Sequence, residues 1–461
     1  MKIKVTDFSL GLREDKSDNL KSLGVAKRLL NFDATTGALV GIKNISNFEF
    51  NTNGVDLAGA KVFFYKKYDF NSKKRADKLI FFDKNLNSYF LELEDLDSGL
   101  KPLEIKFNST PKAQNYRLDG EDVFILVSKE DNMVVWDGVR TPEIVLDAPK
   151  IQSMDIHYER LFGVTAGSDG AELKFSDDLD PTNWSESLSD AGTIELVDDR
   201  GRLLKVVSFN DYLYIFREFG ITRLYANTAI QTNFYINHLF TSGGRILENT
   251  ISLAGDHVFF MSTDGFYVFD GASTKKVLDN FFPLVSFTGD ESATYFNGNY
   301  YLKCKLKGEA DENVLVEIRR DDLSVKIIAG LNPSGVCLLQ KEGEASLVVV
   351  SLTDGKVYKI CEQVTKNAIS LPAVFESPKL GFGKDLSRKV VRSVGLRTIN
   401  PNCSPVKIVI ENNDEKQIEL VSTGERFFSP LFFDGESFSV SISTVDNAVS
   451  VLSFEIEVKE G

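Results

Sequence analysis

The sequence predicts an all-β protein, a β-propeller followed by a C-terminal antiparallel β-sandwich. Seven short hairpin-like units recur through its middle, each with an apolar run, a turn rich in Gly, Asn and Asp, and a second apolar run. Successive units start 38 to 52 residues apart, the usual length of one four-stranded blade. They begin near Leu79, Val123, Leu161, Leu213, Val258, Tyr300 and Leu347. About seven blades are therefore expected, and six to eight fit the pattern.

The local chemistry of each unit supports strands joined by tight turns. The turns read TDG, SDG, KEDN or DKNLN, and these residues accept the positive φ that reverses a strand. The runs between them are rich in Val, Ile, Tyr and Phe, which favour pleated, half-buried surfaces. Apolar runs of four or five residues without a polar break predict strands covered on both faces, as the inner strands of a blade are.

Three parts follow one another along the chain. Residues 1–60 are expected to form an N-terminal segment with a short helix, capped by Ser17 or Asp18, that packs on the propeller. Residues 61–369 hold the propeller. Residues 370–461 contain VKIVIE, SFSVSIS and LSFEIEV, whose period of two predicts a separate sandwich. The stretch 36–64 supplies either a closing strand or a further blade.

Composition restricts the class of partner and the compartment. The formal net charge of −14 disfavours phosphate-driven binding of nucleic acid, because Lys and Arg supply that energy. The first residues lack the apolar core of a secretory signal, and no later run approaches a membrane span. We expect synthesis in the cytoplasm and no membrane insertion. The four cysteines are far apart and lack a C-x-x-C pair, which predicts reduced, mostly buried thiols.

The sharpest local cluster is SDDLDPTNW, residues 176–184. It half resembles the Asp-box of sialidase-type propellers, but Asp180 stands where Gly is required. The favoured interpretation is a structural turn in which Asp180 and Pro181 start the loop and Trp184 fixes it to a blade. A calcium site from Asp177, Asp178 and Asp180 is the alternative, although the spacing matches no recognised loop.

Nothing in the sequence indicates an enzyme. The three histidines form no metal-binding pattern, and no G-x-S-x-G elbow is present. The pair Asp198-Asp199 is interpreted as a solvated hairpin tip. We predict no catalytic residue, no metal site and no cofactor.

Four passages resemble tail hub or nozzle proteins of short-tailed bacteriophages, which include packaged-DNA stabilisation proteins. The opening DFSLGLRED…LGVAKRLLNFDATTGALVGIKN looks like that family's entry segment. LKFSDDLDPTNWSE resembles its loop between two blades. GRLLKVVSFNDYLYIFREFGITRLYA with SGGRILENTISLAGDHVFFMSTDGFYVFDG looks like its central pair of blades, and SPKLGFGKDLSRKVVRSVGLRT resembles its entry into the terminal sandwich.

The resemblance implies a structural virion protein in the phage tail. Members stack as a ring, commonly of six copies, below the portal and adaptor proteins and above a tail needle or plug. The ring conducts and retains genomic DNA without sequence-specific binding. Closed cyclic symmetry repeats one heterologous interface until the ring closes. Acidic walls would keep the duplex centred and unbound in such a channel.

If a ring forms, its interfaces are expected in the stretches that interrupt the blade rhythm, 177–202, 227–247 and 384–392. The candidate interface residues are Arg202, Arg245, Arg388, Lys389 and Arg392.

The alternative function is a carbohydrate-binding or glycan-cleaving propeller that acts in receptor recognition. The imperfect Asp-box and the density of Tyr, Phe and Trp motivate it.

Overall fold

The computed structural model describes residues 1–12, 23–70, 72–167, 170–227, 230–309, 311–341, 343–382 and 387–460. Within these ranges the regular structure is β-strand, apart from the 3₁₀ turns η2 (Leu96–Ser98), η3 (Glu248–Thr250) and η4 (Phe282–Leu284). None of the helical segments described is long and apolar enough to cross a membrane.

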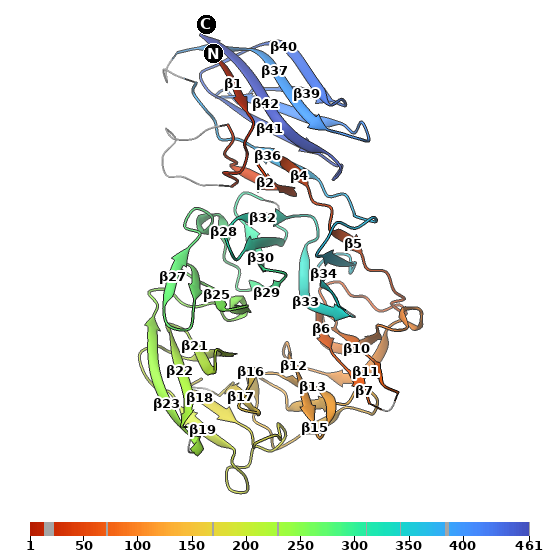
Figure 1. Ribbon diagram of the computed structural model, residues 1–461, viewed down its shortest axis with the longest axis vertical. Coiled ribbons are helices and arrows are strands. Elements are labelled where there is room, and N and C mark those ends of the chain that lie inside the picture. The colour runs from red at the N-terminus through yellow and green to blue at the C-terminus, as the bar shows by residue number, and fades with distance from the viewer. Residues whose placement is uncertain are drawn as a thin grey trace.

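Seven four-stranded antiparallel units surround one axis, so the all-β propeller predicted from the sequence is confirmed (Figure 1). Blades 1 and 2 contain β6 (Lys61–Tyr65), β9 (Lys78–Phe82), β10 (Asn87–Glu92), β11 (Lys101–Lys106), β12 (Lys112–Leu118), β13 (Glu121–Val127), β14 (Met133–Trp136) and β15 (Glu143–Val145). Blades 3 and 4 contain β16 (Ile151–His157), β17 (Arg160–Thr165), β18 (Glu172–Phe175), β19 (Gly192–Glu195), β20 (Leu203–Phe209), β21 (Tyr212–Arg217), β22 (Gly220–Asn227) and β23 (Ile230–Thr241). A small hairpin, β7 (Tyr68–Asp69) and β8 (Lys74–Arg75), projects from blade 1.

Blade 7 is closed by a strand from the other end of the chain. Blades 5 and 6 contain β24 (Ser252–Ala254), β25 (His257–Ser262), β26 (Gly265–Phe269), β27 (Thr274–Val277), β29 (Ser292–Phe296), β30 (Asn299–Leu306), β31 (Val314–Arg319) and β32 (Val325–Ile328), and β28 (Val285–Ser286) adds to β30. Blade 7 consists of β33 (Pro333–Lys341), β34 (Glu344–Ser351), β35 (Val357–Cys361) and the N-terminal β5 (Ile45–Asn47). Of the two roles predicted for residues 36–64, the closing strand is the one found.

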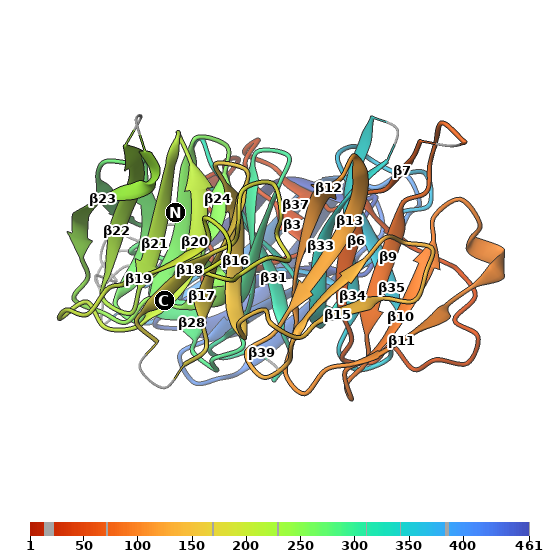
Figure 2. The ribbon, with the colours of Figure 1, turned by 90° about the horizontal axis from the view of Figure 1, so that it is seen from below.

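Apolar clusters between neighbouring blades hold the ring together. Each of seven clusters joins one pair of adjacent blades, and the pair formed by blades 7 and 1 closes the circle. The second strands of the blades are mostly apolar because they are covered on both faces, as in the LIFF run of blade 1. Figure 2 shows the resulting disc from its side, with the strands running across its thickness.

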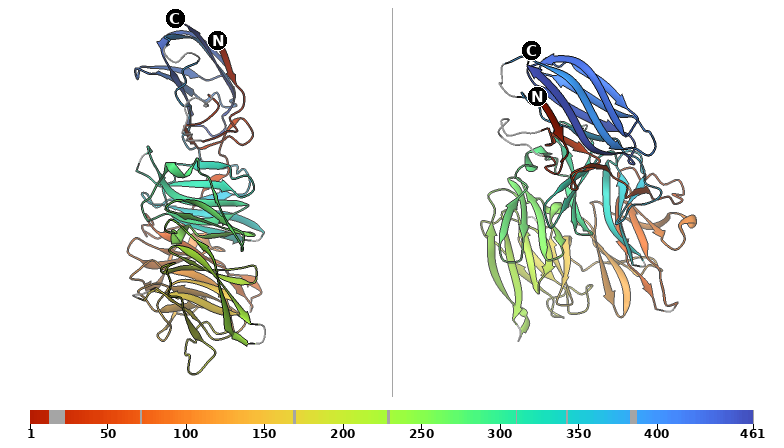
Figure 3. Two further views of the ribbon diagram at one scale, coloured as in Figure 1. Left: turned by 90° about the vertical axis from the view of Figure 1, so that its left-hand side faces the viewer. Right: turned by 45° about the horizontal axis from the view of Figure 1, so that its top comes forward.

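A two-sheet sandwich stands on the rim of the disc, beside blades 6 and 7 (Figures 1 and 3). One sheet contains β1 (Lys2–Val5), β3 (Phe32–Asp33), β4 (Leu39–Gly41), β42 (Ser450–Glu460), β37 (Lys389–Ile399) and β40 (Arg426–Gly435). The other contains β2 (Arg28–Leu30), β36 (Ala373–Glu376), β41 (Phe438–Thr444), β38 (Val406–Asn412) and β39 (Gln417–Ser422). Their inner faces form a separate apolar core.

The N-terminal segment is part of both domains and not a separate element on the propeller. Its strands β1 to β4 belong to the sandwich sheets, and β5 belongs to blade 7. The prediction of a helix is wrong for the residues that the structure describes, because residues 28–30 form the strand β2, which pairs with β36. Its proposed caps, Ser17 and Asp18, lie outside the described residues. The helical spacing of the apolar residues did not decide the structure, because pairing with the free edge of β36 favours a strand.

Asn31 joins the sandwich to the propeller at the end of β2. It is 2% exposed, and its φ of 56° is in the left-handed region that Asn tolerates. Its Nδ2 donates to the carbonyls of Ala329 at 3.1 Å and Pro372 at 2.7 Å, and its Oδ1 accepts from the Ala329 N–H at 2.9 Å. Asn31 thus bonds both to the chain leaving blade 6 and to the chain entering the sandwich.

A charged pair reinforces this junction. The Arg28 guanidinium lies 2.5 Å from the Glu309 carboxylate of blade 6, with two N–H groups on two oxygens. This bidentate geometry is the strong form of an ion pair. The two domains are therefore fastened by hydrogen bonds as well as by chain connectivity.

Candidate interaction surfaces

Three of the predicted interface residues lie at the start of β37 or just before it, and the structure separates their roles. Arg388 is exposed and pairs with Asp434 at 2.7 Å. Lys389 is only 1% exposed, and its Nζ donates to the carbonyls of Ser387 at 3.0 Å and Glu436 at 3.3 Å. The interface role predicted for Lys389 is therefore wrong, because its ammonium already holds two backbone segments together inside the sandwich.

Arg392 does lie on the surface, at a β-bulge. The register of β37 shifts between Val391 and Ser393 against both neighbouring strands. Against β42 Arg392 is the extra residue, whereas against β40 it lies opposite two residues, Leu431 and Phe432. Its guanidinium lies 5.2 Å from the centre of the Phe432 ring, within the range of a cation–π contact.

Two phenylalanines complete a surface that we call the β40 patch, made of Arg388, Arg392, Phe428 and Phe432. Phe428 is 66% exposed and Phe432 is 68% exposed. Within the described chain β40 pairs with β37 alone and forms one edge of its sheet. Sequence reasoning missed these phenylalanines, although the period of two in RFFSPLFFDG places two of its four rings on the outer face.

The other predicted interface residues, Arg202 and Arg245, meet at the rim of blade 4. The Arg202 N–H donates to Oε2 of Glu218 at 3.2 Å, and the Arg245 guanidinium lies 3.0 Å from Oε1 of the same carboxylate. Four of the five predicted residues thus lie on two surfaces of different domains, and Lys389 lies inside the sandwich.

All three predicted interface stretches contain strand residues, and the third holds the start of β37. Residues 230–241 form β23, the long outer strand of blade 4, and residues 192–195 form β19, the outer strand of blade 3. The expectation of irregular loops failed because outer strands face solvent on one side, so their sequences lack the continuous apolar runs that mark the inner strands.

The SDDLDPTNW loop has a dense set of local hydrogen bonds. Oδ1 of Asp180 accepts from the N–H of Thr182 at 2.9 Å and from its hydroxyl at 2.6 Å. The Trp184 indole donates to the carbonyl of Pro181 at 2.9 Å and packs on the apolar cluster between blades 2 and 3. Among the described residues no group of three or more His, Cys, Asp or Glu side chains is arranged to hold a metal ion.

Buried arginines fix the connections around blade 3, and the sequence did not reveal them. Arg217 is 0% exposed and donates to Asp198 at 2.7 Å and to the carbonyls of Leu196 and Gly201, both at 2.8 Å. Burial opposes the charge on Asp198, but hydrogen bonds from the Arg200 N–H and the Arg217 guanidinium outweigh it and lower the pKa of that carboxyl. Asp198 and Asp199 are exposed, as expected for a hairpin tip, but the carboxylate of Asp198 also binds the buried Arg217.

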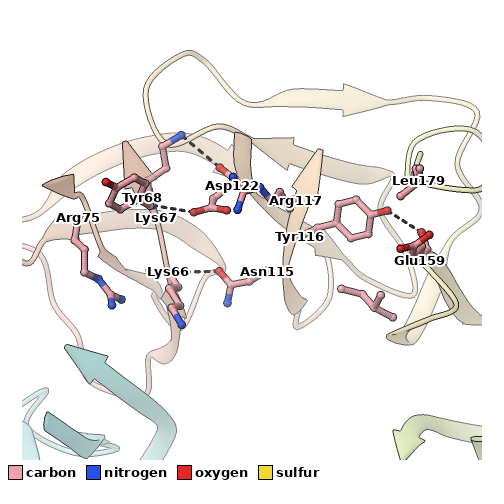
Figure 4. A pocket seen from close by; sticks show the side chains of 11 residues that line it. Lys66, Lys67, Tyr68, Arg75, Asn115, Tyr116, Arg117, Asp122, Glu159 and Leu179 are labelled. Carbon is pink, nitrogen blue, oxygen red and sulfur yellow. Dashed lines mark hydrogen bonds between the residues drawn. The ribbon is translucent and has the colours of Figure 1, made fainter. Parts of the chain in front are cut away.

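A groove opens where the inner hairpins of blades 1 to 3 turn (Figure 4). Its volume is about 620 Å³. It is lined by Lys66, Lys67, Tyr68, Arg75, Asn115, Tyr116, Arg117, Asp122, Ile156, Glu159 and Leu179.

Most polar groups of this groove are already engaged. Asp122 accepts from the N–H of Tyr68 at 2.9 Å, and the Tyr116 hydroxyl donates to the carbonyl of Glu159 at 2.9 Å. The exposed rings of Tyr68 and Phe70 lie edge to face, 4.9 Å apart, and the Arg117 guanidinium lies 4.5 Å from the Phe70 ring. Tyr68 and Arg117 line the groove, and Phe70 lies between them just outside its lining.

The prediction that the four cysteine thiols are mostly buried agrees with the structure only in part. Cys304 and Cys337 are buried, and burial raises the pKa of both, whereas Cys361 is partly exposed and Cys403 is exposed.

No family model matches the sequence, and no curated protein matches it. Among solved structures, two crystal structures of BBS1N in complex with ARL6DN are similar to this chain. The lead-soaked one gives a TM-score of 0.47 with 7% identity, and the mercury-soaked one gives 0.43 with 8% identity. Both matches cover 70% of this chain and 99% of the other. The similarity concerns the all-β propeller fold alone.

Proposed function

We propose that this protein is a structural virion component of a short-tailed bacteriophage. Copies of the chain form a ring, with six expected, below the portal and adaptor, and the ring conducts and retains the packaged DNA. The proposal starts from the four sequence passages that resemble tail hub and nozzle proteins. The β40 patch is the observation that carries it further, because it is a surface suited to bind another copy.

The β40 patch combines features of a subunit interface. Exposed aromatic rings supply apolar area, and arginine beside them is enriched at protein interfaces. An unpaired strand edge offers backbone donors and acceptors to a second chain. The partner surface on the next copy must differ from the patch itself, because a ring repeats a heterologous contact.

The junction at Asn31 supports the same role. A ring that carries load needs subunits whose two domains keep a fixed orientation. Asn31 and the Arg28–Glu309 pair fasten the sandwich to blade 6. The net charge of −14 is consistent with a conduit that does not hold the DNA it passes.

The test is the native mass of the purified chain, measured by light scattering after gel filtration. A multiple of 51.4 kDa is expected for the wild type. The double variant Phe428→Ser, Phe432→Ser should run as a monomer with an unchanged thermal unfolding curve, because both rings are exposed. The matched control Val139→Ser, on an 83% exposed residue of blade 2, should assemble as the wild type does. Equal assembly of all three proteins would exclude the β40 patch as the interface.

A second candidate function is glycan binding, and the groove of blades 1 to 3 is what favours it. An aromatic pair next to convergent polar groups is an arrangement that small-molecule sites use. A glycan array and a hydrolysis screen test this directly. Binding that is lost in Tyr68→Ala would support it, and silence of the wild type in both assays would remove it.

A further inference from the structure

A cavity of about 630 Å³ lies on the axis of the propeller, at the N-terminal ends of the inner strands and apart from both surfaces described above. We call it the axial cavity. All seven blades or the segments that lead into them contribute to its wall. The residues that matter for the argument are Lys61, Lys112, Lys205, Lys303, Ser109 and Asp290.

The axial cavity has an excess of positive charge in an acidic protein. Five lysines line it against three carboxylates, whereas the whole chain carries a net charge of −14. Asp290 serves two of the lysines, with Lys303 at 2.7 Å and Lys61 at 3.9 Å. Lys112 lies 3.7 Å from Glu248. The carboxylates of the cavity are therefore already paired with lysines, and the cavity keeps more ammonium groups than carboxylates.

Lys205 is the clearest unbalanced cation. It lies on β20, and its Nζ donates to the carbonyl of Ile251 at 2.6 Å. No carboxylate pairs with it within the part of the chain that the structure describes. Burial, and then the nearby charge of Lys112, lower the pKa of Lys205 to about 8. An anion in the cavity would supply the missing counter-charge.

Ser109 gives an independent indication of a ligand. It is 8% exposed, and its hydroxyl has no hydrogen-bond partner among the described residues. Buried hydroxyls are nearly always paired, because an unpaired one loses its bonds to water. Ser109 lines the cavity, but its oxygen is covered, so it would donate to an oxyanion there only after a rotation about its χ1 angle.

We propose that the axial cavity binds a small anion that carries phosphoryl groups. Ammonium groups act as point charges for phosphate oxygens, and several of them around one cavity suit an anion with more than one charge. The volume exceeds what a single orthophosphate fills, so a chain of two or three phosphoryl groups is the expected class. This inference does not depend on the proposed virion role.

Titration calorimetry of the full chain with sodium tripolyphosphate at low ionic strength tests the site. The wild type should bind one tripolyphosphate. Lys205→Met, which keeps the aliphatic stem, should weaken binding at least about tenfold, as expected for loss of a charge-assisted hydrogen bond. Ser109→Ala should also weaken binding, while its unliganded melting temperature stays equal or rises because an unpaired hydroxyl is removed.

Lys84→Met is the matched control, because the Lys84 side chain is 64% exposed, pairs with Asp56 and does not line the axial cavity. It should bind as the wild type does. Absence of binding by the wild type would overturn the proposal, and so would equal affinities of Ser109→Ala, Lys84→Met and the wild type. Titration with ADP distinguishes the source of the phosphoryl groups: tighter binding than tripolyphosphate supports a nucleotide, and weaker binding supports a free polyanion.

Discussion

Replacement of Asn31 by alanine should loosen the sandwich from the propeller without unfolding either domain. The side chain is buried and makes three hydrogen bonds that span blade 6 and the chain entering the sandwich. Alanine makes none of them and leaves the N–H of Ala329 without its partner. It must also adopt the φ of 56° that Asn31 accepts.

The expected loss follows from these contacts. Three hydrogen bonds at about 1 kcal/mol each give about 3 kcal/mol. The left-handed backbone adds about 1 kcal/mol for alanine. Asn31→Gly separates the two effects, because glycine relieves the backbone strain and should lose only the hydrogen-bond part, about 3 kcal/mol.

Hydrogen–deuterium exchange measures this loss where it occurs. Peptides covering residues 325–332 and 370–376 should exchange faster in Asn31→Ala, while the cores of blades 2 to 4 keep their protection. The matched control is Asn53→Ala. Asn53 also has a positive φ, and its Nδ2 bonds to the carbonyls of Ser98 and Leu100, but it lies within the propeller. Unchanged exchange at both junction peptides in Asn31→Ala would refute the reasoning.

Three further predictions concern buried polar groups. Burial lowers the pKa of His157 to about 4 from 6.5, so the unfolded chain binds a proton between these values that the folded chain does not. The free energy of unfolding should therefore not depend on His157 above pH 6.5 and should fall by up to about 3 kcal/mol as the pH drops from 6.5 to 4. Urea unfolding measured against pH should show a weaker pH dependence in His157→Gln than in the wild type. Equal pH dependence in the two proteins would contradict the assignment. Arg217→Met should lower the free energy of unfolding by about 3 kcal/mol, because Asp198 and two carbonyls lose their donor; an unchanged melting temperature would show that water replaces the guanidinium. Lys389→Glu should lower the free energy of unfolding of the sandwich, whereas Arg388→Glu, on an exposed residue, should change it by no more than about 0.5 kcal/mol. Similar unfolding curves for both variants would mean that the buried ammonium contributes little.

Patterns of period and turn chemistry predicted the propeller because they are local. Each blade repeats apolar runs and turns such as TDG, and the chain offers no competing arrangement for them. The sandwich strands of the C-terminal region were visible for the same reason, since VKIVIE and SFSVSIS alternate strictly.

Pairing between distant parts of the chain was not predictable from such patterns. Strands β2 and β5 are three residues each, too short for a period to show, and they are fixed by β36 and β35 far along the chain. The spacing of Leu23, Lys27 and Leu30 favoured a helix, but tertiary pairing decided the structure. The same limit applies to the burial of Lys389 and Arg217, because both depend on neighbours that no local pattern reveals.

Electron microscopy of the purified assembly tests the central claim most directly, because the claim is that shape and self-association are the function. Class averages should show a closed ring of copies, six expected, with the sandwich domains in contact through the β40 patch. Averages that show only separate chains, or tail machines that lack this protein, would contradict the account.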